Sequence, residues 1–187
     1  MDIQLITPTI FHVVAYLNLL VWAGVIVTLI AVVSKPAFWP GMKLRIGKYA
    51  KLLAFIITAF ASLGSMWLSN LAGYNPCLLC WWQRIFMYPL AIILLVSLIA
   101  DWRKKVLPVK TYGLTLAGIG AAIAGYHYTV QRIPFMQGTV QCLADASCST
   151  MYLGYWGFFS IPLMAFTAFI GAIVLLAVYL PSEKKKR

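Results

Sequence analysis

Long stretches without any charged side chain dominate this chain of 187 residues. Asp, Glu, Lys and Arg are absent from 3–34, 52–83, 85–100, 111–131 and 146–182. Each stretch approaches or exceeds the ~20 residues that cross a ~30 Å hydrocarbon core as a helix, and the shortest reaches this length if its helix starts near residue 76.

Backbone polar groups in lipid must be satisfied within the spanning segment, which favours helices. We therefore predict an all-α membrane protein with five transmembrane helices, at roughly 10–34, 50–72, 76–100, 111–131 and 157–180. A soluble all-α core is the alternative. A composition with 63% hydrophobic and only 10% charged residues disfavours it.

The 15 Lys and Arg residues are concentrated in three segments. All except Arg84 and Arg132 fall in 35–51, 103–110 and 184–187. Five spans place these segments on one face, which the positive-inside rule assigns to the cytoplasm. We therefore predict an outward N-terminus and a cytoplasmic C-terminus. The net charge of +11 then reflects topology in a lipid bilayer, and we expect no nucleic-acid partner.

The first predicted helix is expected to be retained in the protein. Its leading segment, MDIQLITPTIFH, contains an acidic residue and no Lys or Arg, whereas a cleaved signal peptide begins with a positive region. The simplest role for this helix is an additional lipid-facing span.

The chain has four cysteines, Cys77, Cys80, Cys142 and Cys148, and all lie on the predicted outward side. Disulfides persist on the outer side of a bacterial plasma membrane. In the sequence NPCLLCWWQR, Asn75 is suited to be the N-cap and Pro76 the first helical residue. The first cysteine pair would then lie in the first turn, where the helix dipole stabilises a thiolate.

A column of polar side chains is predicted below this pair. At 3.6 residues per turn, Cys77, Cys80, Arg84 and Tyr88 fall within an arc of about 80° on one helix face. A charge at this depth is unfavourable and therefore indicates a functional site. The alternative is that Arg84 extends to the outer headgroups.

The second pair, Cys142 and Cys148, lies in an outer segment rich in small and polar residues, which predicts an exposed, flexible loop. Three interpretations of the four cysteines remain open. They could bind zinc as four thiolates, form two structural disulfides, or act as a two-step dithiol relay. In the relay, electrons enter at the loop pair and pass to the pair at the helix start.

A relay needs an electron acceptor, and the sequence has no dinucleotide fingerprint or haem-attachment motif. A quinone dissolves in lipid and accepts two electrons, and Arg84 would stabilise its reduced anion. His127, in GYHYTVQR, could add a hydrogen bond or a proton. The alternative is that His127 is simply an interfacial side chain between two tyrosines.

Three segments of the chain resemble the bacterial disulfide-bond formation protein B (DsbB) family, especially its short Gram-positive-type members. The segments are PCLLCWWQRIFMYP, YHYTVQ and CSTMYLGYWGFFSIPLMAF, and the resemblance covers about 50 to 180. It implies a four-helix bundle in the bacterial plasma membrane, with its redox site on the extracytoplasmic face. This bundle would oxidise an extracytoplasmic thioredoxin-fold (DsbA-like) dithiol protein and reduce a membrane quinone, ubiquinone or menaquinone.

The resemblance also implies roles for individual residues. Cys80 would engage the quinone, and Cys77 would be its partner, able to form an inter-loop disulfide. Cys142 would attack the partner protein, and Cys148 would be the resolving cysteine. Arg84 and His127 are the expected quinone-site residues.

Two features depart from the family pattern. The helix at 10–34 is additional, which suggests a division into 1–48, the extra helix and its cytoplasmic connection, and 49–187, the redox bundle. The five-residue spacing of the loop pair is also short. The alternatives are a vitamin K epoxide reductase-like enzyme, in which the C-x-x-C pair follows the loop pair, and a scaffold with structural disulfides.

Overall fold

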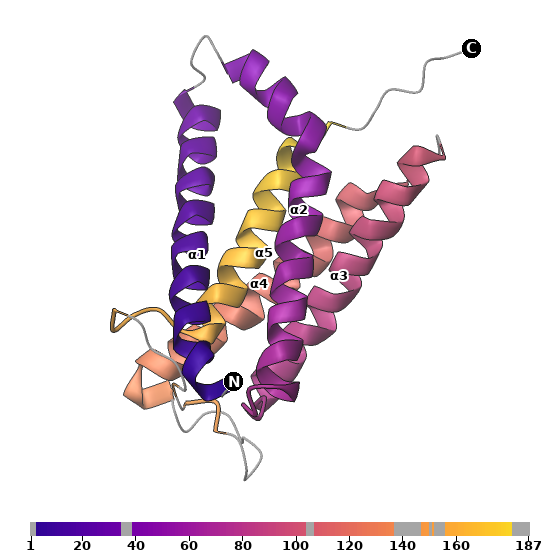
Figure 1. The fold of residues 1–187 in the computed structure, drawn as a ribbon. Helices are drawn as coiled ribbons and strands as arrows, with labels where there is room; N and C mark the ends of the chain where they lie inside the picture. The colour runs from indigo at the N-terminus through magenta and orange to yellow at the C-terminus, as the bar shows by residue number, and fades with distance from the viewer. Residues whose placement is uncertain are drawn as a thin grey trace, which may run out of the picture.

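The computed structural model describes residues 3–34, 39–103, 107–136, 147–149, 151 and 156–180. Within these residues the chain forms helices and no strand, which confirms an all-α fold with five α-helices (Figure 1). The elements are α1 (Ile3–Ser34), α2 (Trp39–Asn70), α3 (Leu78–Trp102), α4 (Val109–Arg132), the 3-10 turn η1 (Pro134–Met136) and α5 (Ile161–Val178).

Helix boundaries differ most from the predicted ones at the start of α2. This helix begins at Trp39, about three turns before the predicted start near residue 50. The additional turns carry exposed cations such as Lys43, Arg45 and Lys48. The start of an uncharged stretch predicts where a helix enters lipid. It does not predict the first residue of the helix, because helical backbone can extend beyond the membrane. Pro40 is tolerated there because it lies in the first turn.

In the part of the chain that the structure describes, four helices are long and apolar enough to cross a membrane, namely α1 over Phe11–Ser34, α2, α3 and α5. The fifth, α4, has 24 residues, or ~36 Å, but is less hydropathic. Its glycines explain part of this difference. A Cβ at Gly120 would lie 2.2 Å from the ring of Phe169, and one at Gly113 would lie 2.7 Å from Leu176. These glycines allow α4 to approach α5 closely, as small residues do between membrane helices.

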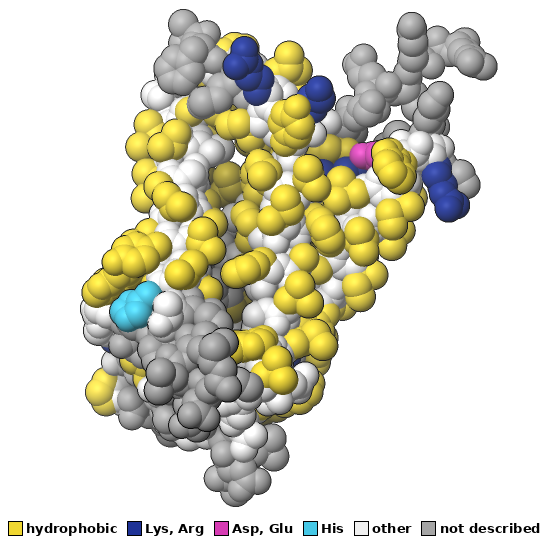
Figure 2. Space-filling model, viewed as in Figure 1, with side chains coloured by type: hydrophobic (Ala, Val, Ile, Leu, Met, Phe, Trp, Pro, Cys, Tyr) yellow, Lys and Arg dark blue, Asp and Glu magenta, His cyan; other side chains and the backbone are white. Residues whose placement is uncertain are grey.

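Helices α2 to α5 form a closed ring of neighbours. α2 packs against α3 and α5, and α4 packs against the same two helices from the other side. The ring encloses a core that includes Leu90, Leu94, Ala117, Phe169 and Leu176. α1 lies outside the ring and packs against α5 (Figure 1). Apolar side chains cover the flanks of the helices, as expected for a surface that faces lipid (Figure 2).

The helices alternate in direction, so the molecule has two chemically different ends. The start of α1, the connection from α2 to α3, η1 and the start of α5 lie at one end, called here the cysteine end (Figure 1). The start of α2, the end of α3 and the start of α4 lie at the other, the cationic end. Exposed Lys43, Arg45, Lys48, Arg103 and Lys110 belong to the cationic end. Lys104, Lys105 and residues 184–187 lie outside the described residues.

One cation of this end, Lys51, is buried instead of exposed, with 3% of its surface accessible. Its ammonium group donates to Ser97 Oγ at 3.0 Å and pairs with Asp101. It also lies 5.4 Å from the centre of the Tyr179 ring. Lys51 therefore links α2 to α3 and to the residue after α5.

Candidate redox site

The first cysteine pair lies where α3 begins, although the helix starts two residues later than predicted. Cys77 is the N-cap, with φ −72° and ψ 171°, and its carbonyl accepts the Trp81 N–H at 3.1 Å. The prediction that Asn75 caps the helix and Pro76 begins it is therefore wrong. The chain turns at Gly73, which has φ +73°, and then runs outside the helix through residue 76. Both thiols nevertheless remain at the helix N-terminus.

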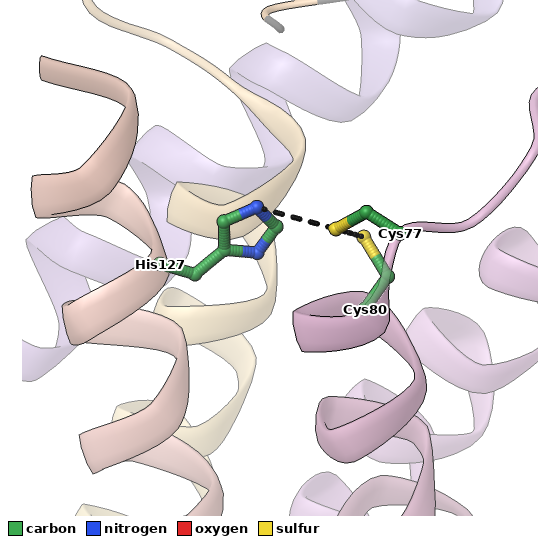
Figure 3. Close-up of side chains that lie close together, drawn as sticks. All are labelled: Cys77, Cys80 and His127. Atoms are coloured by element: carbon green, nitrogen blue, oxygen red, sulfur yellow. Dashed lines mark hydrogen bonds between the residues drawn. The ribbon is translucent and has the colours of Figure 1, made fainter. Parts of the chain in front are cut away.

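Cys77 and Cys80 are thiols with their sulfur atoms 3.3 Å apart (Figure 3). A disulfide bond is about 2.05 Å long, so a small movement would join them. Cys77 is buried and Cys80 partly buried. The hydrogen bond that Cys77 donates to Cys80, together with burial, raises the pKa of Cys77 to about 12. Of this thiol pair, Cys77 therefore holds its proton.

His127 reaches the same thiols from α4 and is buried (Figure 3). Its Nε2 lies 3.6 Å from Cys77 Sγ and 3.2 Å from the Cys148 carbonyl oxygen. Its Nδ1 lies 2.8 Å from Gln83 Nε2. A carbonyl can only accept, so these contacts place the imidazole proton on Nε2, and Gln83 donates to Nδ1. His127 thus directs an N–H towards Cys77 and Cys148 together.

Cys148 is packed against the first cysteine pair. It is 1% exposed and shares a small apolar cluster with Cys77, Leu79 and Val130. The prediction of an exposed loop pair is therefore wrong for Cys148, because its side chain joins the apolar packing at the start of α3. Cys142 lies outside the described residues.

The predicted polar column on α3 does face one space. A pocket of about 810 Å³ is lined by Cys77, Cys80, Arg84 and Tyr88 of this column, and also by His127. Helical periodicity counted from Cys77, the N-cap, into α3 therefore placed these four side chains on the correct face.

Arg84 is held beside this pocket by α2. Its Nε donates to Ser65 Oγ at 2.8 Å, and a terminal nitrogen donates to the Ser65 carbonyl at 3.0 Å. Its guanidinium also lies 5.1 Å from the centre of the Trp81 ring. The two bonds to Ser65 occupy two of the five N–H groups of an arginine. The group is thus fixed in direction while it lines the pocket.

Sequence reasoning missed two residues that orient the predicted ones, Gln83 and Ser65. Gln83 is buried and contacts His127. Gln83 is the one side-chain amide in a mainly apolar helix, and this is a signal that could have identified it. Ser65 carries no comparable signal, because α2 contains other serines at similar spacing.

The three groups Cys77, Cys80 and His127 have ligand atoms within 4.8 Å of one another, close enough to hold a metal ion. In the observed hydrogen bonding, however, His127 Nε2 carries a proton, whereas a metal ligand must present a lone pair. The zinc interpretation also requires Cys142, outside the described residues. The geometry fits a dithiol site better.

The fold and this site together define a class, that of multi-helix membrane proteins with a dithiol at the start of one helix. The model of the DsbB family, described as "Disulfide bond formation protein DsbB", matches residues 47–180. The chain belongs to this family, as its sequence motifs indicated.

Curated relatives give the same assignment. The chain is 38% identical over 134 residues to "Disulfide bond formation protein C" of Bacillus subtilis, which covers 71% of this chain and 93% of the relative. It is 39% identical over 137 residues to "Probable disulfide formation protein" of Oceanobacillus iheyensis, covering 72% and 92%. It is also 38% identical to "SPbeta prophage-derived disulfide bond formation protein B" of Bacillus subtilis, covering 68% and 83%. No solved structure matches the chain. The family supports a role in disulfide bond formation.

Proposed function

We propose that this protein is a protein-dithiol:quinone oxidoreductase of the bacterial plasma membrane. One observation carries the proposal. A single pocket is lined by Cys77, Cys80 and Arg84, and Cys77 contacts His127 and packs in the same cluster as Cys148. Thiol exchange and transfer to a lipid-soluble acceptor would therefore take place at one location.

The proposed electron path has three steps, each moving two electrons. A thioredoxin-fold dithiol partner attacks a Cys142–Cys148 disulfide, and its two thiols become a disulfide while Cys142 and Cys148 become thiols. These thiols then reduce a Cys77–Cys80 disulfide. Finally, the Cys77–Cys80 dithiol becomes a disulfide again as two electrons and two protons pass to a membrane quinone, ubiquinone or menaquinone, giving a quinol.

Burial supports different roles for the two cysteines of the loop pair. A soluble partner protein cannot reach a sulfur that is 1% exposed, so Cys148 is poorly placed to meet it. Cys148 is instead well placed to exchange with Cys77, with which it packs. We therefore assign attack by the partner to Cys142 and the inter-loop exchange to Cys148 and Cys77.

Arg84 and His127 would serve different steps. Arg84 lines the pocket beside Cys80 and would stabilise negative charge that develops on the quinone. His127 contacts Cys77 and the carbonyl of Cys148, so it would hold or move the proton during exchange between the pairs.

The proposed orientation places the cysteine end outside the cell and the cationic end in the cytoplasm. We keep the division into 1–48, the additional helix and its connection, and 49–187, the redox bundle, although α2 begins at Trp39 and the boundary therefore falls within its first turns. Two cysteines introduced into a cysteine-free variant test this orientation. Ser147→Cys, exposed at the cysteine end, should react with a membrane-impermeant reagent in intact spheroplasts, and Lys110→Cys only after lysis. The reverse pattern would invert the topology.

The function is tested by mixing the purified protein, a quinone and a reduced thioredoxin-fold dithiol, and following quinone absorbance. We expect one quinol for each partner disulfide formed, and no turnover in Cys77→Ser/Cys80→Ser. A wild-type protein that oxidises the partner without consuming quinone would refute the quinone assignment.

The order of the relay is tested by trapping. Cys148→Ser should accumulate a reductant-sensitive complex with the partner through Cys142, and Cys142→Ser should abolish it. A complex trapped through Cys77 or Cys80 in a variant without the loop pair would instead indicate a one-pair oxidase.

A further inference from the structure

The pocket that contains Cys80 and Arg84 has a wall that the redox bundle does not supply. α1 contributes Phe11, Val14, Leu17, Asn18, Leu20 and Val21 to its lining. The family match begins at residue 47, so this wall lies outside the part of the chain that the family describes. The remaining walls come mainly from α2, α3 and α5.

The pocket extends well beyond the cysteines along the helices. Its α1 lining runs from Phe11 to Val21, or ~15 Å of helix, and its α2 lining from Ile56 to Leu68, or ~18 Å. Cys80 and Arg84, in contrast, lie within the first two turns of α3. Figure 2 shows the hollow between α1 and α2 on the visible face.

Helices α1, α2 and α5 meet at the end of the pocket lining that is farthest from the cysteines. A Cβ at Gly171 would lie 3.1 Å from Val21 Cγ1 and 3.6 Å from Ile57 Cδ1, so the glycine admits both side chains. Next to Val21, Trp22 Nε1 donates to Thr167 Oγ1 at 2.8 Å and ties α1 to α5. Between this junction and the cysteine end, α1 and α2 line the pocket from two sides.

The chemistry of the lining differs between the two ends. The cysteine end presents thiols, a guanidinium and an imidazole. On α1, Asn18 is the single polar residue among the lining residues named above, and its amide nitrogen donates to the Val14 carbonyl at 3.0 Å. The long part of the pocket thus presents an almost wholly apolar surface to its contents.

We infer that α1 forms one wall of a chamber for the isoprenoid tail of the quinone, and that the protein therefore prefers quinones that carry such a tail. The inference rests on the proposed function. If the quinone head group lies beside Cys80 and Arg84, its tail would extend into the long apolar part of the same pocket. α1 would then be a specificity element instead of a passive extra span.

Two neighbouring valines allow a matched test with the full-length protein. Val14 lines the pocket, whereas Val13 is 55% exposed and does not. Val14→Trp should narrow the chamber, and Val13→Trp adds the same side chain on an outward face of α1. The two acceptors are a naphthoquinone with an isoprenoid tail and the same ring with only a methyl group in its place.

For wild type, we expect a lower KM for the tailed quinone than for the tail-less ring. Val14→Trp should raise this KM roughly tenfold or more, a range usual for steric changes in apolar pockets, while Val13→Trp should match wild type. The KM for the tail-less ring should change little in either variant. Gly64→Leu adds a side chain from the α2 wall into open space and should repeat the effect, with Gly118→Leu on α4 as its control.

A second readout does not depend on turnover. This readout is the amount of tailed quinone that remains bound to the protein through gel filtration. The amount should fall in Val14→Trp and Gly64→Leu and be unchanged in the controls Val13→Trp and Gly118→Leu. Equal loss of both quinones, no loss of either, or loss only of a co-purified phospholipid would each overturn the tail assignment. If wild type reduces neither quinone, the proposed function fails, and the inference fails with it.

Discussion

The Nε2 atom of His127 lies 3.6 Å from the sulfur of Cys77 and 3.2 Å from the carbonyl oxygen of Cys148. This one nitrogen therefore contacts a residue from each cysteine pair, although the residues come from three separate parts of the chain. Gln83, 2.8 Å from the opposite ring nitrogen, holds the imidazole in the orientation that points Nε2 at both.

We predict that His127→Phe slows electron transfer from the loop pair to Cys77–Cys80 by roughly 10²–10⁴-fold, the usual range for loss of a positioned acid or base. The rate is measured by acid quenching and alkylation after mixing with a reduced partner. His12→Phe, exposed on α1, is the matched control. Gln83→Leu should slow the same transfer by a smaller factor and alter its dependence on pH, because the His127 ring would no longer be held in one orientation. An unchanged transfer rate in His127→Phe would reduce the histidine to a packing residue.

The contacts of Arg84 predict a defect confined to the quinone step. Arg84→Met should lower kcat/KM for quinone by ~10²–10³-fold, as for loss of one preorganised electrostatic contact, and leave exchange at the loop pair unchanged. Arg103→Met, exposed at the cationic end, is the control. Ser65→Ala should have a weaker effect of the same kind, because Ser65 only orients the guanidinium. Equal kinetics with quinone in Arg84→Met and wild type would indicate that Arg84 simply extends to the headgroups.

The raised pKa of Cys77 predicts how this thiol reacts with alkylating reagents. With a pKa raised to about 12, Cys77 stays protonated at pH 8 and should react slowly with iodoacetamide. The largest cause is its hydrogen bond to Cys80, so Cys80→Ala should lower this pKa and shift the alkylation profile of Cys77 to lower pH. Mass spectrometry of variants that also carry Cys142→Ser and Cys148→Ser gives the rate at each pH. The same midpoint with and without Cys80 would contradict the assigned cause.

The sequence predicted those parts of the site that depend on one helix alone. The absence of charge identified the helices, and angular spacing placed Cys77, Cys80, Arg84 and Tyr88 on the face that lines the pocket. It could not predict that Cys148 is buried against Cys77 or that Gln83 supports His127, because both contacts join different segments. Periodicity describes one element at a time and contains no information about its neighbours.

Lys51 illustrates the same limit at the cationic end. Its position in a cationic segment contained no sign of burial, yet Lys51 is buried and bonded to Asp101 and Ser97. Whether a lysine near a span end is solvated or buried depends on what the neighbouring helix offers. Here α3 offers a serine and an aspartate one turn apart.

The Lys51–Asp101 ion pair predicts that its two single substitutions destabilise the fold unequally. Asp101→Ala leaves the buried ammonium of Lys51 without its counter-charge and should destabilise the fold by roughly 3 kcal/mol. Lys51→Met should cost less, because the remaining carboxylate is 39% exposed and can be solvated. The double variant Lys51→Met/Asp101→Leu should recover much of the loss. The midpoint of unfolding by SDS in mixed micelles measures each change, with Lys48→Met as the exposed control. Equal losses in the two single variants would argue against this account of the pair.

In the proposed path, the dithiol at the start of α3 gives its electrons directly to quinone. The most direct measurement is an anaerobic single turnover with the fully reduced Cys142→Ser/Cys148→Ser variant, mixed with one equivalent of quinone. We predict stoichiometric quinol, seen by absorbance, together with a Cys77–Cys80 disulfide, seen as a loss of 2 Da in the mass of the protein, since a dithiol loses two hydrogens on oxidation. Cys80→Ser in the same background should give neither. If the reduced variant leaves the quinone unreduced, or if quinol forms while Cys77 and Cys80 remain thiols, the electron path proposed here is wrong.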